Sequence, residues 1–182
     1  MPRGDSSAEH IRTRALALFS RHGVAGTSLQ MIATELGVTK AAIYYHYRAK
    51  EDIVRAVLAP AFDGFDALLD EVAHLTPHDQ PRALVDALAR QAVAHRELYA
   101  VVLQDVTAAQ LRRESAGHLE TFRRLRDMLA GPDGQEEAVV RATVFLSGLM
   151  GPAVDPDVAR LDDATLERAI ARAGYGLLRL EV

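Results

Sequence analysis

Apolar residues recur every three or four positions along the start of the chain, which is the spacing of amphipathic helices rather than of strands. Two capping-box patterns, S-x-x-E at 6–9 and T-x-x-Q at 27–30, mark helix starts, because such side chains satisfy free backbone N–H groups. Gly23 and Gly37 follow the two apolar stripes and are expected to end them. The pattern therefore predicts two helices before residue 37.

A third, short helix is predicted over 40–47, with Thr39 as its N-cap. A fourth begins near Lys50 and carries an apolar stripe. Pro60 then interrupts the pattern, because a proline in a helix interior removes a hydrogen bond and clashes with the preceding turn. We expect a kink or break there, and a resumed helix over 61–74.

The rest of the chain keeps the helical period and is divided by turn-forming stretches, which contain most of its prolines. No segment favours a strand over a helix, so the predicted fold class is all-α. The expected helices cover 82–95, 98–105, 108–129, 136–150 and 163–180. Asp162-Asp163 is interpreted as the N-cap of the last helix rather than as a pair of catalytic carboxylates.

The stretch 29–47 meets three demands of a helix-turn-helix. A small residue is needed where the two helices approach, and Ala33 provides it. A residue that tolerates positive φ is needed in the turn, and Gly37 follows four positions later. An apolar residue must hold the second helix against the first, and Ile43 follows six positions on, with Val38 filling the turn. Together these spacings are fairly specific for the motif.

The second helix of this motif is unusual for a core helix, because it combines short side chains with hydrogen-bond donors. Ammonium and hydroxyl groups donate to phosphate oxygens, and short side chains let a helix sit deep in a DNA groove. Tyr47 falls on the same face as Ile43, so we expect it in the core. The residues expected to face DNA include Lys40, Ala41, Ala42, Tyr44 and Tyr45.

Charge is unevenly distributed along the chain. The net charge is −4, yet residues 1–50 carry a formal +4 and residues 51–182 a formal −8. A basic head on an acidic body fits a protein that touches nucleic acid at one end only. The chain has no cysteine and no apolar run long enough to span a bilayer. We therefore expect a cytoplasmic protein without disulfides and without a membrane partner.

The stretch 37–53, GVTKAAIYYHYRAKEDI, resembles the recognition-helix signature of the TetR/AcrR family of transcriptional regulators. The stretch 17–33 resembles the family's first two helices, so the resemblance covers about residues 8–58. It implies a three-helix helix-turn-helix DNA-binding domain at 1–50 and a helical ligand-binding and dimerisation bundle at 51–182. Two residues depart from the family pattern: Tyr47 stands where phenylalanine is usual, and Pro60 interrupts a helix that is usually continuous.

The resemblance also implies a set of DNA contacts. The start of the second helix would reach phosphates, with Gln30 near a base as well, and Thr39 and Lys40 would contact the backbone and a base edge. The tyrosines of the recognition helix would contact phosphates, and Lys50 would hold another at the start of the fourth helix. The full predicted set is Thr27, Ser28, Gln30, Thr39, Lys40, Ala41, Tyr44, Tyr45, His46 and Lys50.

Other chemistry finds little support in the sequence. His74 and His78 with Asp79 have ligand-like spacing, but they cross a predicted helix end, so a solvated loop is the preferred interpretation. His95 and His118 stand alone on amphipathic helices. No nucleophile motif or phosphate-binding glycine loop is present. We expect no enzyme activity, no cofactor and no metal.

Aromatic residues of the C-terminal helices are candidates for a small-molecule site, because helical bundles build such sites between facing helices. Each of them taken alone fits simple core packing better. The apolar faces of these helices show no excess of charge, so an apolar or neutral effector is expected. The candidate ligand set is Phe62, Phe65, Tyr99, Phe122 and Phe145, with Met128 at its edge.

The last two long helices carry more apolar residues than one buried stripe requires. A twin pair from a second copy would cover the excess as a four-helix interface, although a helix central to its own bundle would show the same pattern. We expect a homodimer. The candidate interface residues are Val144, Leu149, Leu166, Ile170 and Leu177.

These inferences combine into one functional prediction. A symmetric dimer places two recognition helices in successive major grooves of a palindromic double-stranded operator, about 34–36 Å apart, and acts as a repressor. A small molecule between the C-terminal helices favours a spacing that no longer fits and releases the operator. Two rivals remain open: a helical ligand- or partner-binding protein whose helix-turn-helix no longer binds DNA, and, with less support, an enzyme.

Overall fold

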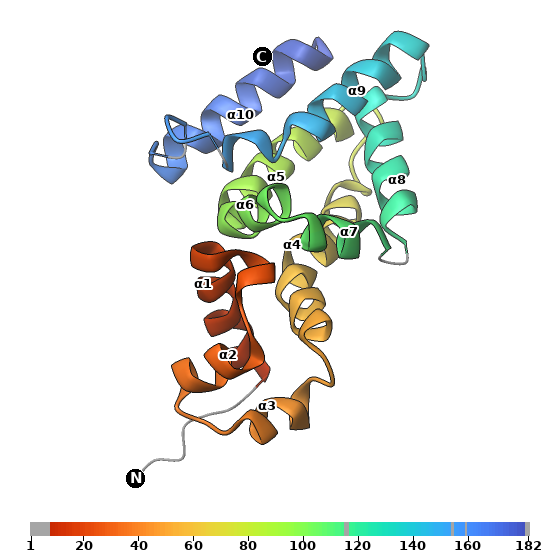
Figure 1. The fold of residues 1–182 in the computed structure, drawn as a ribbon. Helices are drawn as coiled ribbons and strands as arrows, with labels where there is room; N and C mark the ends of the chain where they lie inside the picture. The colour runs from red at the N-terminus through yellow and green to blue at the C-terminus, as the bar shows by residue number, and fades with distance from the viewer. Residues whose placement is uncertain (1–7, 115–116, 154, 159, 181–182) are drawn as a thin grey trace. The chain divides into compact units, whose positions relative to one another are not determined.

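A computed structural model describes residues 8–114, 117–153, 155–158 and 160–180, which are helical almost throughout (Figure 1). No strand occurs in these ranges, so the all-α prediction is confirmed. No helix in them is both long and apolar enough to cross a membrane. The helices are α1 (Ala8–Gly26), α2 (Leu29–Leu36), α3 (Lys40–His46), α4 (Lys50–Val72), α5 (Gln80–Ala94), α6 (Arg96–Gln104), α7 (Val106–Glu114), α8 (His118–Ala130), α9 (Glu136–Gly148), the short 3-10 turn η1 (Gly151–Ala153) and α10 (Asp163–Leu178).

The chain folds into two compact units. The head unit comprises Met1–Pro60 and Ala100–Ser115, and the bundle unit comprises Ala61–Tyr99 and Ala116–Val182. The predicted DNA-binding segment, 1–50, lies within the head unit. The head unit also includes α7 and the end of α6, which come from the part of the chain expected to bind ligand.

The head unit is built on α1, which packs against both α2 and α7, while α3 packs against α2. The apolar stripes of these helices supply the buried side chains, as their spacing predicts. Gly23 has φ 70 and ψ 164, a non-helical conformation within α1, which agrees with the helix end predicted there. The core of this part comprises Ile11, Ala15, Leu18, Phe19, Val24, Ile32, Ala33, Ile43, Ile53 and Val54.

The bundle unit contains a closed ring of four helices, because α5 packs on α8, α8 on α9, α9 on α10 and α10 on α5 (Figure 1). One contact in this ring is very close. A Cβ atom added to Gly174 would lie 2.7 Å from Val85 Cγ1 and 2.8 Å from Phe145 Cε2, closer than real Cβ contacts come. The absence of a side chain at Gly174 therefore brings α10 close to α5 and α9.

Of the kink or break predicted at Pro60, the break does not occur. A single helix, α4, runs through Pro60 and ends at Val72 rather than at residue 74. Pro60 is exposed, so the carbonyl of Ala56, which a proline leaves without its helical donor, can be satisfied by solvent. The helix therefore tolerates the proline.

The single long helix predicted over 108–129 is also wrong. Two helices, α7 and α8, replace it, and Gly117 between them has φ 87, in the left-handed region that favours glycine. The apolar period continues across this break, which is why the pattern alone suggested one helix. The other predicted helices are present, with ends that differ by a few residues.

Candidate nucleic-acid interface

The turn between α2 and α3 has the geometry of a Schellman motif. Gly37 has φ 67 and ψ 27, and its N–H donates to Thr34 O at 3.1 Å. The next N–H, of Val38, donates to Ala33 O at 3.0 Å. A Cβ at Gly37 would meet no other atom within 4 Å, so the positive φ alone calls for glycine. Ala33 and Ile43 are fully buried, as the motif predicts.

Both helices of the motif have hydroxyl caps. Thr39 Oγ1 accepts the N–H of Ala42 at 3.3 Å, which confirms the predicted cap of α3. The cap of α2 is Ser28, whose Oγ accepts the N–H of Met31 at 3.2 Å, rather than Thr27. Thr27 is buried, and its hydroxyl bonds to the preceding Gly23 O instead.

Helix α3 is buried on one side and exposed on the other. Ile43 faces the core, while the side chain of Tyr45 is 86% exposed and that of Tyr44 47% exposed. Lys40 Nζ lies 5.7 Å from the centre of the Tyr44 ring, a cation–π contact across one helical turn. Lys40, Ala41 and His46 are exposed as well. The predicted recognition residues therefore share an accessible surface that carries donors and aromatic rings.

Tyr47 lies apart from this surface. It is half-buried after the end of α3, and its hydroxyl donates to Ala8 O at 3.2 Å. Burial raises the pKa of Tyr47, partly offset by the nearby charge of Arg12. The hydroxyl that distinguishes Tyr47 from a phenylalanine thus bonds to the start of α1.

Two of the predicted DNA contacts are engaged within the protein. Thr27 is 1% exposed, and its hydroxyl donates to Gly23 O at 2.8 Å, so this burial does not support a phosphate contact. Lys50 Nζ donates to Val24 O at 2.8 Å and to Thr27 O at 3.1 Å. An ammonium group has three protons, which leaves one for a phosphate. Ser28 and Gln30 are exposed at the start of α2.

Asp105, which lies 81 residues further along the chain, also bonds to the end of α1 at Val24. Its Oδ2 accepts the N–H of Val24 at 2.8 Å, and its Oδ1 accepts those of Thr107 and Ala108 at 2.9 and 3.1 Å, at the start of α7. The peptide groups flanking Val24 are thus bonded to Asp105 on one side and to Lys50 on the other. An Asp before a helix is a recognisable cap signal, but no sequence pattern links it to a loop 81 residues away.

The predicted ligand residues do not form one group. Phe62 makes edge contacts with Phe65 and with Tyr99, each with ring centres 6.0 Å apart. Tyr99 is fully buried and its hydroxyl lies 3.4 Å from Ala61 O, while burial raises its pKa. Phe145 instead lies against α10 at Gly174. Phe122 is half-buried on α8.

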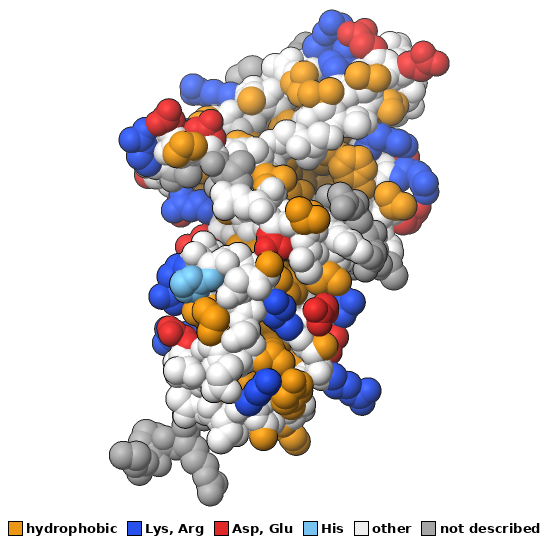
Figure 2. Space-filling view, viewed as in Figure 1, with side chains coloured by type: hydrophobic (Ala, Val, Ile, Leu, Met, Phe, Trp, Pro, Cys, Tyr) orange, Lys and Arg blue, Asp and Glu red, His pale blue; other side chains and the backbone are white. Residues whose placement is uncertain are grey.

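The predicted interface residues differ in exposure. Leu149, Leu166 and Ile170 are buried within the bundle unit, whereas Val144 is 54% exposed and Leu177 half-buried. A groove of about 240 Å³ runs between α9 and α10, and orange side chains gather on these helices in Figure 2. The groove residues are Val144, Phe145, Gly148, Leu149, Pro152, Ile170, Ala173 and Leu177.

The histidine pair His74 and His78 is exposed, and the described residues hold no group of three or more His, Asp or Glu side chains placed for a metal. Asp162 caps α10 as predicted, because its Oδ1 accepts the N–H of Thr165 at 2.9 Å. The hydrogen bonds from Thr165 lower the pKa of Asp162.

The second helix of the helix-turn-helix presents its hydrogen-bond donors outward, and the rest of the described chain is helical. This combination is typical of DNA-binding helix-turn-helix proteins. Residues 11–57 match the model of bacterial regulatory proteins, tetR family. The transcriptional regulator AcrR of Shigella flexneri is 51% identical over 45 residues, which is 25% of this chain and 21% of AcrR. The matched segment therefore spans only about a fifth of that relative.

The likeness of the fold extends much further. The crystal structure of AmtR from Mycobacterium smegmatis matches with a TM-score of 0.71 and 26% identity, covering 100% of this chain and 91% of AmtR. A FadR from Bacillus subtilis, solved in complex with stearoyl-CoA, matches with a TM-score of 0.68 and 13% identity, covering 91% of this chain and 96% of that one. Residues 11–57 thus carry the segment typical of the tetR family of bacterial regulatory proteins, and the chain as a whole is similar in fold to these solved structures.

Proposed function

We propose that this protein is a cytoplasmic transcriptional repressor that binds a palindromic operator as a homodimer and is released by a small-molecule effector. One observation carries the proposal: α3 follows a glycine turn, buries Ile43 and leaves Lys40, Tyr44 and Tyr45 accessible together. An exposed tyrosine beside a lysine suits phosphate contacts in the major groove, and no packing need explains a ring that is 86% exposed.

Operator binding is tested by selecting a duplex from a random library with the wild-type protein and then titrating variants. Tyr45→Ala and Lys40→Ala should each weaken binding about tenfold, because each removes a contact while leaving the core intact. Lys40→Ala should also lower the slope of log affinity against log salt by about one per half-site. Arg55→Ala, which removes an exposed α4 cation paired with Asp52 at 3.1 Å, is the matched control. Unchanged affinity in both α3 variants would remove the assignment.

Dimerisation through α9 and α10 is supported by the apolar surface that these helices leave exposed. Val140 and Val144 are 59% and 54% exposed on one face of α9, beside the apolar groove. Soluble proteins rarely leave such surface uncovered when it is contiguous. A second copy related by twofold symmetry would cover it with the same two helices.

Sedimentation equilibrium distinguishes a dimer from a monomer. The wild type should be a dimer at micromolar concentration, and Val144→Asp should dissociate because it buries a carboxylate in the interface. Leu119→Asp is the control, since Leu119 is an apolar residue on α8 that is even more exposed than Val144, at 75%. A monomeric wild type would contradict the dimer. Arg substitutions at Leu149 or Leu166 are unsuitable, because these buried side chains also hold the monomer together.

We propose that the effector binds to the bundle unit. A FadR of the same fold holds stearoyl-CoA, so the architecture accommodates an organic ligand. We infer that a change near α6 and α7 reaches the helix-turn-helix through Asp105, which bonds Val24 near the end of α1. The exposed Pro60 lies at the boundary of the two units in sequence, so a second route runs along α4. Equal operator-release curves for wild type and Pro60→Ala would leave Asp105 as the route.

A further inference from the structure

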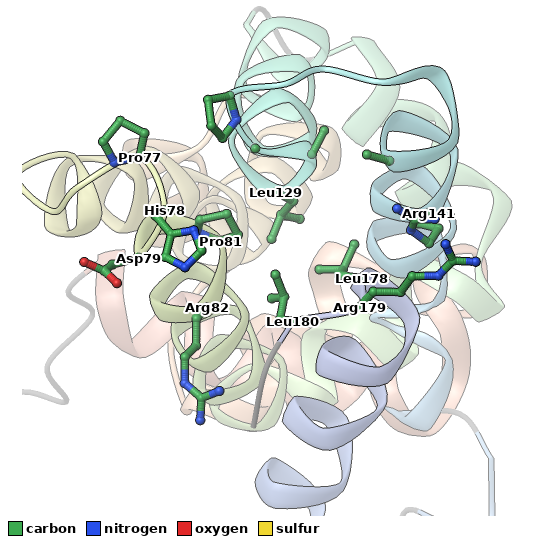
Figure 3. Close-up of a pocket in the computed structure, with 14 residues that line it drawn as sticks. Pro77, His78, Asp79, Pro81, Arg82, Leu129, Arg141, Leu178, Arg179 and Leu180 are labelled. Atoms are coloured by element: carbon green, nitrogen blue, oxygen red, sulfur yellow. The ribbon is translucent and has the colours of Figure 1, made fainter.

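A cavity of about 430 Å³ lies at one end of the four-helix ring (Figure 3). The start of α5, the end of α8, the first turns of α9 and the end of α10 meet there. Its volume falls within the range of about 300–1,000 Å³ that is usual for small-molecule sites. Its lining includes none of the aromatic residues that the sequence analysis assigned to a ligand.

The wall of this cavity is largely apolar. Figure 3 shows Leu129, Leu178 and Leu180 between the two sides of the opening. Three prolines and two alanines complete the apolar lining: Pro77, Pro81, Pro132, Ala130 and Ala138. Such a surface suits a hydrocarbon or aromatic body, because burying it releases ordered water.

Three guanidinium groups stand around this apolar wall. Arg82 lies on one side, and Arg141 and Arg179 lie on the other (Figure 3). Glu137 Oε1 lies 2.6 Å from Arg141 Nη1 and 3.0 Å from Arg179 Nη2. Asp79 also lines the cavity, and its carboxylate accepts a hydrogen bond from Thr76 Oγ1 at 2.7 Å. The lining residues together with Glu137, which pairs with two of them, carry a formal charge of +1; Asp86 lies outside the lining.

Two of the arginines, Arg82 and Arg141, are held in place, whereas the Arg179 side chain is 69% exposed. The Arg82 guanidinium lies 4.5 Å from the centre of the Tyr175 ring, and the Tyr175 hydroxyl bonds to Asp86. The Arg141 side chain is only 20% exposed, and its buried Nε and Nη1 make no hydrogen bond with the described residues, although Nη1 pairs with Glu137. Arg141 therefore has donor capacity that is unused in the cavity wall.

Helix dipoles do not account for the positive charge, because two helix starts and two helix ends meet at the cavity and offset one another. The side chains alone set its preference. An apolar wall with one net positive charge and preformed guanidinium groups matches an amphipathic anion.

We propose that this cavity binds an organic monoanion, an apolar body that carries a single carboxylate. The carboxylate meets the guanidinium groups of Arg141 and Arg179, Arg82 adds its charge from the other side, and the body lies on Leu129, Leu178 and Leu180. This differs from the apolar or neutral effector that the sequence suggested. Its role as the effector site rests on the regulator function proposed above, whereas the binding chemistry does not.

Two matched pairs of probes test the chemistry: octanoate against octanamide, and 4-butylbenzoate against 4-butylbenzamide. Each pair keeps the apolar body and removes only the charge. Calorimetric titration of the full chain should show at least one carboxylate binding about tenfold or more tightly than its amide. Amides that bind as well as the acids, or carboxylates that show no saturable binding in the millimolar range, would overturn the proposal.

Variants locate the site. Arg179→Gln should weaken carboxylate binding about tenfold, Arg82→Gln should weaken it by less, and Ala138→Leu, which fills the cavity, should weaken acid and amide alike. Arg168→Gln, on an exposed arginine of α10 bonded to Thr165, is the control and should leave binding unchanged. Wild-type affinity in both arginine variants, with each folded by circular dichroism, would place the ligand elsewhere and refute the site.

Operator binding is measured in the same samples. If the variants weaken carboxylate binding as expected but the protein selects no operator, the binding site stands and the regulator function is refuted. Operator binding without carboxylate binding does the reverse. Release of the operator by octanoate or 4-butylbenzoate in the wild type, and its loss in Arg179→Gln, would join the two.

Discussion

The helix-turn-helix of the head unit and the four-helix ring of the bundle unit are stabilised by different kinds of contact. In the first, Ser28, Gly37 and Thr39 fix the helix ends through hydrogen bonds that reach no more than five residues along the chain. In the second, Gly174 of α10 lies against Val85 of α5 and Phe145 of α9. Local hydrogen bonds shape one region, and packing between distant segments shapes the other.

This difference bears on function. A recognition helix must be held at a set angle, and a turn specified by caps and a positive φ provides that angle without a large core. A ring of helices held by apolar side chains can accept many sequences, provided that volume and pattern are kept. The region that would read DNA is therefore rigidly specified by a few residues, while the region that would bind ligand is free to vary.

The largest expected effect comes from the tightest contact in the bundle. Gly174→Ala should lower the free energy of unfolding by about 1–3 kcal/mol, because its Cβ would overlap with a valine methyl and a phenylalanine ring that have little room to move. The measurement is urea denaturation of the full chain. If packing between distant segments did not govern the bundle, this substitution would be harmless.

Gly176→Ala is the matched control for this prediction. A Cβ at Gly176 would meet no atom within 4 Å, and the residue is exposed on the same helix. Because alanine favours helix over glycine, this variant should be stabilised by roughly 0.5–1 kcal/mol. Opposite signs two residues apart would show that close approach, not helix propensity, makes glycine necessary at Gly174.

The same contrast explains what the sequence could predict. The ends of α2 and α3 were predicted within a residue or two, because Gly37 and Thr39 act on their own neighbours. The burial of Thr27, the internal bonds of Lys50 and the position of Phe145 were not predicted. The bonds of Lys50 and the position of Phe145 depend on segments distant in the sequence, and neither side chain carries a local sign of which segment that is. Thr27 bonds to the preceding helix end, a choice that its capping pattern concealed.

Asp105 tests whether the head unit also depends on a distant contact. Asp105→Ala removes the acceptor for Val24 N–H and the cap of α7 together, so the free energy of unfolding should fall by about 1–2 kcal/mol. Operator affinity should fall as well, because the affected loop leads into α2. The neighbouring exposed Gln104→Ala is the control. Loss of stability without loss of affinity would show that the helix-turn-helix keeps its geometry by local bonds alone.

The smallest effect concerns a local bond within the bundle, the cap of α10. Hydrogen bonds from Thr165 lower the pKa of Asp162 in the folded state, so the ionised cap contributes stability above its unfolded pKa of about 3.9. That contribution is lost as pH falls through the lower, folded pKa. Asp162→Asn keeps a capping side chain but does not titrate, so wild type should exceed it in urea midpoint at pH 7 and lose the advantage in acid. Because Asp162 is exposed, the difference should be small, and a gap that persists unchanged below pH 4 would mean that the charge of the cap contributes nothing.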